Sequence, residues 1–371
     1  MARKNHYWNI NNILSKGCIY NVVYGERSNG KTYGVLQYAL EEYFKNGSEL
    51  AVIRRMEEDF RGKRANQLFA PLIENGVIER LSKGKYNSVK YYSQRWYFQH
   101  IEQKKENCYT EELPFGYAFA LTSMEHDKSS SYPKVKNVLF DEFITRNMYL
   151  PDEFITFQNT LSTIIRDRDD VIIFMLGNSV NKYGCPYFKE MGLTNYGKQE
   201  QGTIDVYTYG DSGLRVAVEF CGENKHKVEK KSNKYFAFNN PKLQMITKGA
   251  WEMDIYPHLP IKYTPKHIKY MYFIKFEGVI LQCEIIYTET EEGRKVAFTY
   301  IHRKTTKIND SKGKYLVYQQ DFSPLPNYRR RITLANNNLE KFILSFFRKD
   351  KIFYQDNDVG EIVRNYLQWA E

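Results

Sequence analysis

A lysine and a threonine follow two glycines at a spacing that suits phosphate binding. Residues 25 to 32 read GERSNGKT and match the pattern G-x-x-x-x-G-K-[ST]. Glycines let backbone N–H groups turn toward a bound phosphate, and the following helix N-terminus adds positive potential. We expect Lys31 to reach the β- and γ-phosphates and Thr32 to bind Mg²⁺. The predicted nucleotide-binding loop comprises Gly25, Glu26, Arg27, Ser28, Asn29, Gly30, Lys31 and Thr32.

Two adjacent acids supply the second half of the predicted site. Asp141 and Glu142 follow the apolar run VLF within residues 135–143, VKNVLFDEF. Asp141 is predicted to hold Mg²⁺, and Glu142 to polarise the attacking water as the general base. A glutamate at this point favours ATP turnover over slow GTPase switching. We expect this strand to lie beside the strand that carries the phosphate-binding loop.

Further basic and polar residues stand where they could approach a nucleotide. The stretch LAVIRR ends in Arg54 and Arg55, which would contact phosphate or a neighbouring subunit, or form a solvated strand end. Lys128 precedes the Asp-Glu strand, and Asn178 ends the apolar run VIIFMLGN, where it would position water or sense the γ-phosphate. Arg166 or Arg168 is predicted to act as an arginine finger in a neighbour's site; the alternative is stabilisation of a helix C-terminus.

The local patterns predict the elements that position these residues. A strand over 18–24 precedes the loop, and apolar residues at helical spacing follow it from 33 to 47. Strands are expected at 50–55 and 171–178, and a helix at 151–168. Residues 86–101 alternate as a hairpin does, with a turn at 93 and 94. The order of strand, loop and helix predicts an α/β, parallel-rich sheet of the phosphate-loop ATPase class that uses a strand-borne catalytic glutamate (ASCE type).

Composition limits the classes of protein and partner. The 371 residues are 42% hydrophobic and 26% charged, with a net charge of +10. The length predicts two domains, and the charge predicts a polyanionic partner; the alternative is a basic soluble protein. The five cysteines have no C-x-x-C spacing and indicate reduced thiols in a cytosolic setting. Neither a signal peptide nor a membrane span is expected.

The remaining chain predicts a linker and a second domain. Residues 207–264 include the lysine-rich run CGENKHKVEKKSNK and are expected to form a linker or hinge between a 1–206 ATPase domain and a 265–371 domain. Three strands at 270–276, 278–287 and 295–302, then helices at 339–347 and 359–367, predict an α+β, ribonuclease-H-like domain. These strands lack the several acids of a two-metal nuclease, so no nuclease activity is expected. The candidate nucleic-acid contacts, each alternatively a solvated side chain, are Lys225, Lys227, Lys230, Lys231, Arg329, Arg330 and Arg331.

The quoted motifs resemble those of a known family. Taken in order, the segments YGERSNGKT, VIRR, HDKSSSYP, VLFDEFI, TIIRDRDD and LGN resemble the DNA-packaging (encapsidation) ATPases of small short-tailed phages with protein-capped linear genomes. The resemblance covers about the first 200 residues.

This resemblance implies a ring, typically a homopentamer, that docks on the phage portal and pumps double-stranded DNA into a procapsid with ATP and Mg²⁺. A packaging RNA takes part in some members. It also implies that Arg166 acts in trans, that Arg54 and Lys128 lie near the nucleotide or the subunit interface, and that the second domain is a vestigial nuclease. The protein would work in the host cytoplasm, transiently on the procapsid. A ring helicase of the same class and a nucleotide-gated assembly protein are the alternatives.

Overall fold

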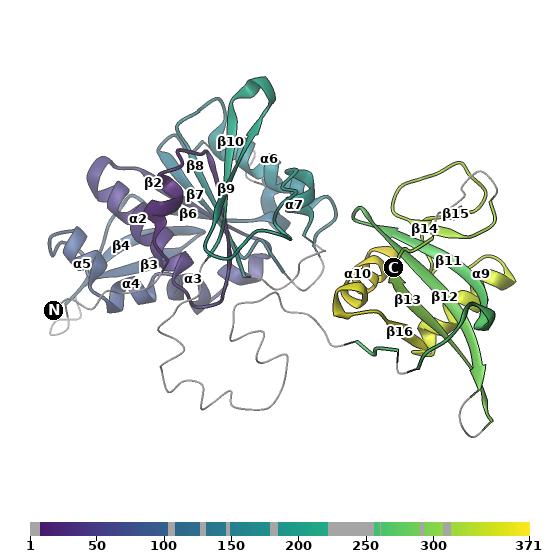
Figure 1. Ribbon diagram of the computed structural model, residues 1–371. Helices are drawn as coiled ribbons and strands as arrows, with labels where there is room; N and C mark the ends of the chain where they lie inside the picture. Colours follow the sequence, from purple (N-terminus) through teal and green to yellow (C-terminus); the bar gives the residue numbers. More distant parts are fainter. Residues whose placement is uncertain are drawn as a thin grey trace. The chain divides into compact units, whose positions relative to one another are not determined.

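The computed structural model describes residues 8–102, 108–126, 131–145, 149–178, 185–221, 256–259, 261–289, 293–306 and 313–371. The chain divides into two compact units, Met1–Trp251 and Glu252–Glu371 (Figure 1). Each unit has its own β-sheet.

The first unit is built on a ten-stranded sheet with the order β3-β4-β6-β2-β7-β8-β1-β10-β9, in which β5 pairs with β4. The strands are β1 (Tyr20–Gly25), β2 (Glu49–Arg54), β3 (Ser88–Tyr92), β4 (Arg95–Ile101), β5 (Cys108–Thr110), β6 (Gly116–Ala120), β7 (Val135–Asp141), β8 (Ile172–Asn178), β9 (Ile204–Tyr209) and β10 (Leu214–Phe220). The described helices are α1 (Ile10–Leu14), α2 (Lys31–Asn46), α3 (Lys63–Gln67), α4 (Ala70–Glu74), α5 (Val77–Leu81), α6 (Glu153–Ile165) and α7 (Pro186–Glu190), with 3₁₀ turns η1 (Glu57–Phe60), η2 (Leu121–His126) and η3 (Gly210–Ser212).

The central strands β6, β2, β7, β8, β1 and β10 are parallel, so their carboxyl ends meet at one edge. The acid-bearing strand β7 is not the neighbour of β1, because β8 pairs with both. The expectation that the acid-bearing strand lies directly beside the loop-bearing strand was therefore wrong, because one strand separates them. The loop and the acids still project from the same edge, because β1, β8 and β7 run parallel.

Helices cover both faces of this sheet (Figure 1). On one face, α2 buries Val35, Leu36, Ala39 and Leu40 against alternate strand residues such as Val23 and Val52. On the other face, α6 buries Phe157, Leu161 and Ile164 against the strand side chains that point the other way, such as those of Val22 and Phe140. Side chains alternate along a strand, so near-continuous apolar strands such as NVVY and VLF are what a sheet covered on both sides requires.

The predicted elements are confirmed in type, while the predicted domain boundary is wrong. The hairpin, the loop helix and the strands at 50–55, 135–143 and 171–178 all form, with ends shifted by a few residues. The boundary at 206 falls inside β9, and β10 pairs in parallel with β1. Residues 207–220 therefore belong to the first sheet and not to a linker. The lysine-rich run from residue 222 onward lies outside the described residues.

The second unit contains a six-stranded sheet with the order β15-β14-β11-β12-β13-β16. Its strands are β11 (Ile268–Phe276), β12 (Val279–Glu289), β13 (Lys295–Arg303), β14 (Val317–Gln319), β15 (Tyr328–Arg329) and β16 (Ile352–Tyr354); its helices are α9 (Asn338–Arg348) and α10 (Asn357–Ala370), after a 3₁₀ turn η5 (Pro265–His267). The meander β11-β12-β13 is antiparallel, and β14 and β15 run parallel to β11. Three antiparallel strands followed by two parallel ones give the strand order of the predicted ribonuclease-H-like fold, to which β16 adds an outer strand beside β13.

Two amphipathic helices complete the second unit. α10 contacts β11, β13 and β16 and buries Val359, Ile362, Val363 and Tyr366. Asn337 caps the N-terminus of α9, because its side chain accepts a hydrogen bond from the N–H of Glu340. Among the helices that the structure describes, none is long and apolar enough to cross a membrane.

Burial predicts which thiols react. Cys18, Cys185, Cys221 and Cys283 are buried, and Cys108 is exposed. Burial raises the pKa of Cys185 to about 11 and that of Cys221 to about 12, which keeps both thiols protonated and poorly nucleophilic at neutral pH. We expect iodoacetamide to label Cys108 in the native protein and all five thiols in denaturant, as counted by mass spectrometry. A second thiol that is labelled as fast as Cys108 would contradict this packing.

Candidate nucleotide-binding site

The loop between β1 and α2 adopts the conformation that its glycines predict. Gly25 has φ +144°, and a Cβ there would lie 3.0 Å from the Cβ of Cys221. Gly30 has φ +89° and caps the N-terminus of α2. Arg27 and Ser28 are exposed, whereas Glu26 and Asn29 are buried. Two glycines at positive φ, followed at once by a helix N-terminus, are the backbone geometry that binding of an anion requires.

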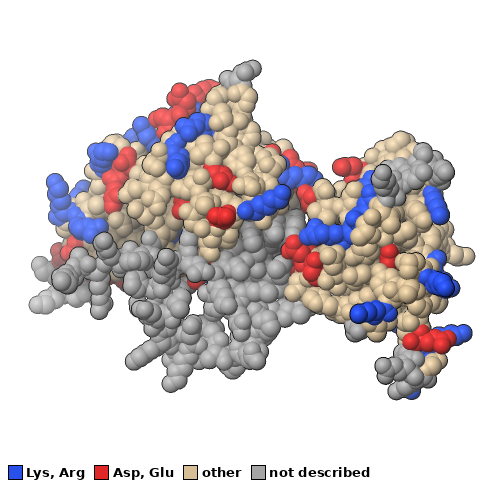
Figure 2. Space-filling model, in the orientation of Figure 1, with Lys and Arg blue, Asp and Glu red and all other residues tan. Residues whose placement is uncertain are grey.

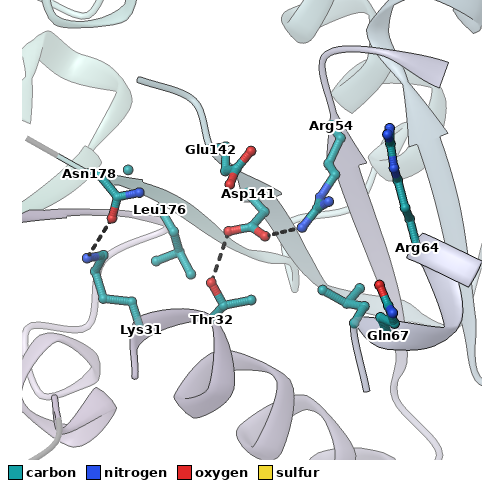
Figure 3. Close-up of a pocket in the computed structure, with 11 residues that line it drawn as sticks. Lys31, Thr32, Arg54, Arg64, Gln67, Asp141, Glu142, Leu176 and Asn178 are labelled. Carbon is teal, nitrogen blue, oxygen red and sulfur yellow. Dashed lines mark hydrogen bonds and ion pairs between the residues drawn. The ribbon is translucent and has the colours of Figure 1, made fainter. Parts of the chain in front are cut away.

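Lys31 is held at the entrance of this loop. Its Nζ donates to the carbonyl oxygen of Glu26 at 2.7 Å and to Asn29 Oδ1 at 3.2 Å. It also lies 3.5 Å from Oδ1 of Asn178, at the end of β8. The predicted polar residue and the predicted phosphate-binding lysine are thus brought together from separate elements (Figure 3).

Thr32, Asp141 and Arg54 form a second cluster at the same sheet edge. Thr32 Oγ1 donates to Asp141 Oδ1 at 3.0 Å, and the Arg54 guanidinium lies 2.8 Å from Asp141 Oδ2. Burial lowers the pKa of Arg54, but the charge and hydrogen bond of Asp141 outweigh burial, so the net pKa is raised. A hydroxyl and a carboxylate oxygen are the hard ligands that Mg²⁺ prefers, and the pair fits a magnesium site. Arg54 is therefore not a solvated strand end.

These residues line one cavity of about 390 Å³. Its lining residues are Lys31, Thr32, Arg54, Arg64, Gln67, Leu68, Asp141, Glu142, Leu176, Gly177 and Asn178. Figure 3 shows Lys31 and Asn178 on one side, Asp141 and Thr32 in the middle, and Arg54, Arg64 and Gln67 on the other side. A cavity lined by three cationic and two acidic side chains, beside a glycine-containing loop at a helix N-terminus, suits a triphosphate with a divalent cation.

Glu142 stands on a strained turn directly after β7. Its φ is +63°, an unfavourable value for a residue with a long side chain, and its side chain reaches the cavity. The turn passes closely over the end of β8, where a Cβ on Gly177 would lie 2.7 Å from Ile144. The N–H of Phe143 donates to the carbonyl oxygen of Leu176 at 3.1 Å. The backbone is therefore fixed tightly around the predicted base.

The two arginines after α6 differ in their contacts. The Arg168 guanidinium donates to five backbone carbonyl oxygens, those of Tyr132, Pro133, Val135, Ile164 and Ile165, at 2.7–3.2 Å. It is a structural tie between α6 and the start of β7. Arg166 is exposed at the C-terminal end of α6, with φ +53°, and is absent from the described residues that line the cavity. Between the two, Arg166 is the candidate for an arginine finger.

Sequence reasoning missed part of the cavity wall. Arg64 and Gln67 belong to the short helix α3 and face the cavity from the side of Arg54 (Figure 3). Arg64 Nη1 donates to the carbonyl oxygen of Glu58 at 3.1 Å, and the side chain is exposed. No motif marks a five-residue helix, and a cluster of basic residues at 61–64 was the only available signal. Lys128 lies outside the described residues.

Of the predicted nucleic-acid contacts, the structure describes the three arginines 329–331. Lys225, Lys227, Lys230 and Lys231 fall outside the part of the chain that the structure describes. Arg330 and Arg331 are exposed, while Arg329 is partly buried and paired with Glu340 at 2.7 Å. Figure 2 shows Lys and Arg side chains in separate groups on the visible face of the second unit, with acidic groups between some of them. The basic charge is dispersed there.

Arg329 is therefore expected to contribute to stability. Burial raises the pKa of Glu340, but hydrogen bonds from the Asn336 N–H and from Arg329 outweigh it and lower the net pKa. A lowered carboxyl pKa gives stability that is present above the unfolded pKa and is lost as the pH falls through the folded one. We expect Arg329→Ala to lower the free energy of unfolding by about 2 kcal/mol at pH 7, with a smaller loss in acid.

Urea denaturation at pH 7 and in acid checks this expectation, and Arg331→Ala is the matched control. Arg331 is exposed and its guanidinium lies 3.3 Å from the carbonyl oxygen of Glu371, so its removal should change stability by less than about 0.5 kcal/mol. Unchanged stability of Arg329→Ala together with weakened DNA binding would instead restore Arg329 as a DNA contact.

The sheet order, the glycine loop, the strand-borne acids and the shared cavity define the first unit as a phosphate-loop fold of the ASCE class, followed by a smaller α+β unit. The chain belongs to the family of podovirus DNA encapsidation proteins (Gp16), which matches residues 2–196. This family is the one that the sequence motifs resembled.

Individual relatives agree with this assignment. The chain is 29% identical over 188 residues to the DNA packaging proteins of Bacillus phages PZA and phi29, which is 50% of this chain and 50% of each relative. The match thus spans about half the length of these relatives. A chain in the structure of the bacteriophage Phi-29 viral genome packaging motor assembly has a similar fold, with a TM-score of 0.55, 18% identity and 98% of both chains covered.

Proposed function

We propose that this protein is the ATP-hydrolysing subunit of a ring that moves double-stranded phage DNA into a procapsid. The observation that carries the proposal is the cavity in which Lys31, Thr32, Asp141 and Glu142 meet at one sheet edge, in a member of the encapsidation family. A triphosphate fits the loop, because its N–H groups, the helix N-terminus and Lys31 all favour anionic oxygens.

The residues of this chain divide the chemistry between them. Thr32 and Asp141 would hold Mg²⁺, which when bound neutralises charge on the β- and γ-phosphates. Glu142 lines the same cavity and orients the attacking water as general base, while Asn178 and Arg54 bind from either side. Arg166 enters a neighbouring subunit's site, which requires hydrolysis at the interfaces of a homo-oligomeric ring. A pentamer is the form that the family resemblance implies.

The second unit is assigned to nucleic-acid or portal contacts, with a packaging RNA as a further partner implied by the resemblance. A motor that grips any sequence needs backbone contacts, which depend on salt. Among the described residues, no group of three or more His, Cys, Asp or Glu could hold a metal ion. The absence of nuclease activity stays a prediction, as does a working place in the host cytoplasm.

The decisive experiment measures ATPase activity of the purified protein with and without double-stranded DNA, together with its mass in solution. We expect stimulation by blunt duplex of any sequence, a decline with added salt, and a multimeric mass. A ring helicase would instead unwind forked duplexes without a procapsid. A protein that binds nucleotide but hydrolyses it slowly or not at all, with a rate that Glu142→Gln leaves unchanged, would be an assembly protein. That result would contradict the proposal.

A further inference from the structure

A buried ion pair lies directly behind the turn that carries Glu142. Arg55 Nε and Nη2 donate to the two carboxylate oxygens of Glu153 at 2.8 and 2.9 Å. The two side chains are only 10% and 0% exposed. Burial lowers the pKa of Arg55, but Glu153 outweighs burial and the net pKa is raised. Arg55 is therefore a permanently charged, rigid fork inside the unit.

The same guanidinium holds the turn after β7. Its Nη1 lies 3.3 Å from the carbonyl oxygen of Glu142, and its Nη2 donates to that of Phe143 at 3.0 Å. Glu142 has a positive φ, and such a conformation persists only where surrounding contacts compensate for its cost. Arg55 provides such contacts without lining the nucleotide cavity itself.

The Glu153 carboxylate is fixed in turn by two hydrogen bonds from outside its own helix. The Tyr187 hydroxyl donates to its Oε1 at 2.9 Å, and the Leu150 N–H donates to its Oε2 at 2.8 Å. The Tyr149 ring lies 4.9 Å from the Arg55 guanidinium carbon, at cation–π distance. Tyr187 of α7 and the backbone of Leu150 thus fix the α6 carboxylate that pairs with Arg55, and Arg55 itself directly follows β2.

We propose that Arg55 and Glu153 are positioning residues that set the Glu142 turn and thereby the place of its carboxylate in the cavity. This inference rests on the proposed role of Glu142 as the base. An arginine suits this positioning role, because one planar guanidinium can bridge a carboxylate and two carbonyl oxygens at the same time. A lysine ammonium group lacks this geometry. Loss of the fork moves the carboxylate while the phosphate-binding loop on β1 is left intact.

The test is Arg55→Lys in the full-length chain, with steady-state ATPase kinetics and binding of a nonhydrolysable ATP analogue. We expect kcat to fall about 10- to 100-fold while analogue affinity changes less than about 2-fold, because a misplacement near 1 Å has effects of that size. Arg61→Lys is the control, since Arg61 is 64% exposed and pairs only at the surface with Glu57 and Glu58; its kcat should not change.

The same substitution made in the Glu142→Gln variant distinguishes a positioning role of Arg55 from a general effect on stability. If Arg55 acts through Glu142, Arg55→Lys adds no further loss to Glu142→Gln, whereas a merely structural role would lower both backgrounds equally. Should Arg55→Lys fail to fold, Tyr187→Phe removes one hydrogen bond to Glu153 and is expected to lower kcat about 2- to 5-fold with the same lack of effect in Glu142→Gln.

The outcomes distinguish the two ideas. A kcat for folded Arg55→Lys within 2-fold of the wild type overturns the positioning role, as does an equal loss in both backgrounds. If only Tyr187→Phe folds, an unchanged kcat of that variant also overturns the positioning role. If Glu142→Gln itself hydrolyses ATP at the wild-type rate, the proposed base is wrong, and the positioning role falls with it.

Discussion

Replacing Glu142 by glutamine is expected to lower kcat for ATP hydrolysis by about 10²- to 10⁴-fold, the usual contribution of a general base. The amide keeps the size of the side chain and loses the acceptor that takes the proton from water. Nucleotide affinity should stay within a few-fold, because the loop, Lys31 and the Thr32–Asp141 pair remain in place. Single-turnover hydrolysis and analogue binding by calorimetry measure the two quantities separately.

Glu58→Gln is the matched control for this substitution. Its carboxylate is exposed in η1, outside the cavity, so neither kcat nor affinity should change. Equal loss of binding and turnover in Glu142→Gln would show that the carboxylate binds substrate or supports the fold, and would remove it from the role of base.

Replacing Arg166 is expected to lower kcat by about 10³- to 10⁵-fold, the range for a trans arginine finger. The backbone offers a clean variant. Arg166 has φ +53° at the end of α6, and glycine adopts that conformation more readily, so Arg166→Gly should remove the charge without destabilising the helix end. An inactive protein of unchanged or raised thermal stability would separate a catalytic role from stabilisation of the helix terminus.

Mixing experiments test whether the arginine acts between subunits. Arg166→Gly and Glu142→Gln subunits are each inactive alone, but a mixed ring contains some interfaces with an intact Glu142 and an intact Arg166. We expect partial recovery of ATPase activity at intermediate ratios. Absence of recovery in rings shown to be mixed contradicts the trans assignment. Arg168→Ala, which loses its ties to backbone carbonyl oxygens, should lower thermal stability and should not be complemented in this way.

Local sequence patterns determined the parts of the site that lie within one short segment. The loop from Gly25 to Thr32 depends on glycine conformations and a helix that starts at once, and both are encoded by neighbouring residues. The acids after β7 follow from an apolar run with a polar end. Because parallel strands bring their carboxyl ends to one edge, even the meeting of Lys31, Asp141 and Asn178 was predictable.

Only the tertiary structure decided what depends on pairing between distant segments. The position of β8 between β1 and β7, and the addition of β10 beside β1, are choices among strands of similar character. The bonds from Arg168 to residues 132–135 and the pair of Arg55 with Glu153 likewise join segments far apart along the chain. Arg329 pairs with Glu340, which is near in sequence but belongs to a different element, α9. Side-chain type specifies a charge, and local periodicity specifies a helix or a strand. Which partner that charge or element meets is set by the packing of the whole unit, and no short window of sequence contains that information.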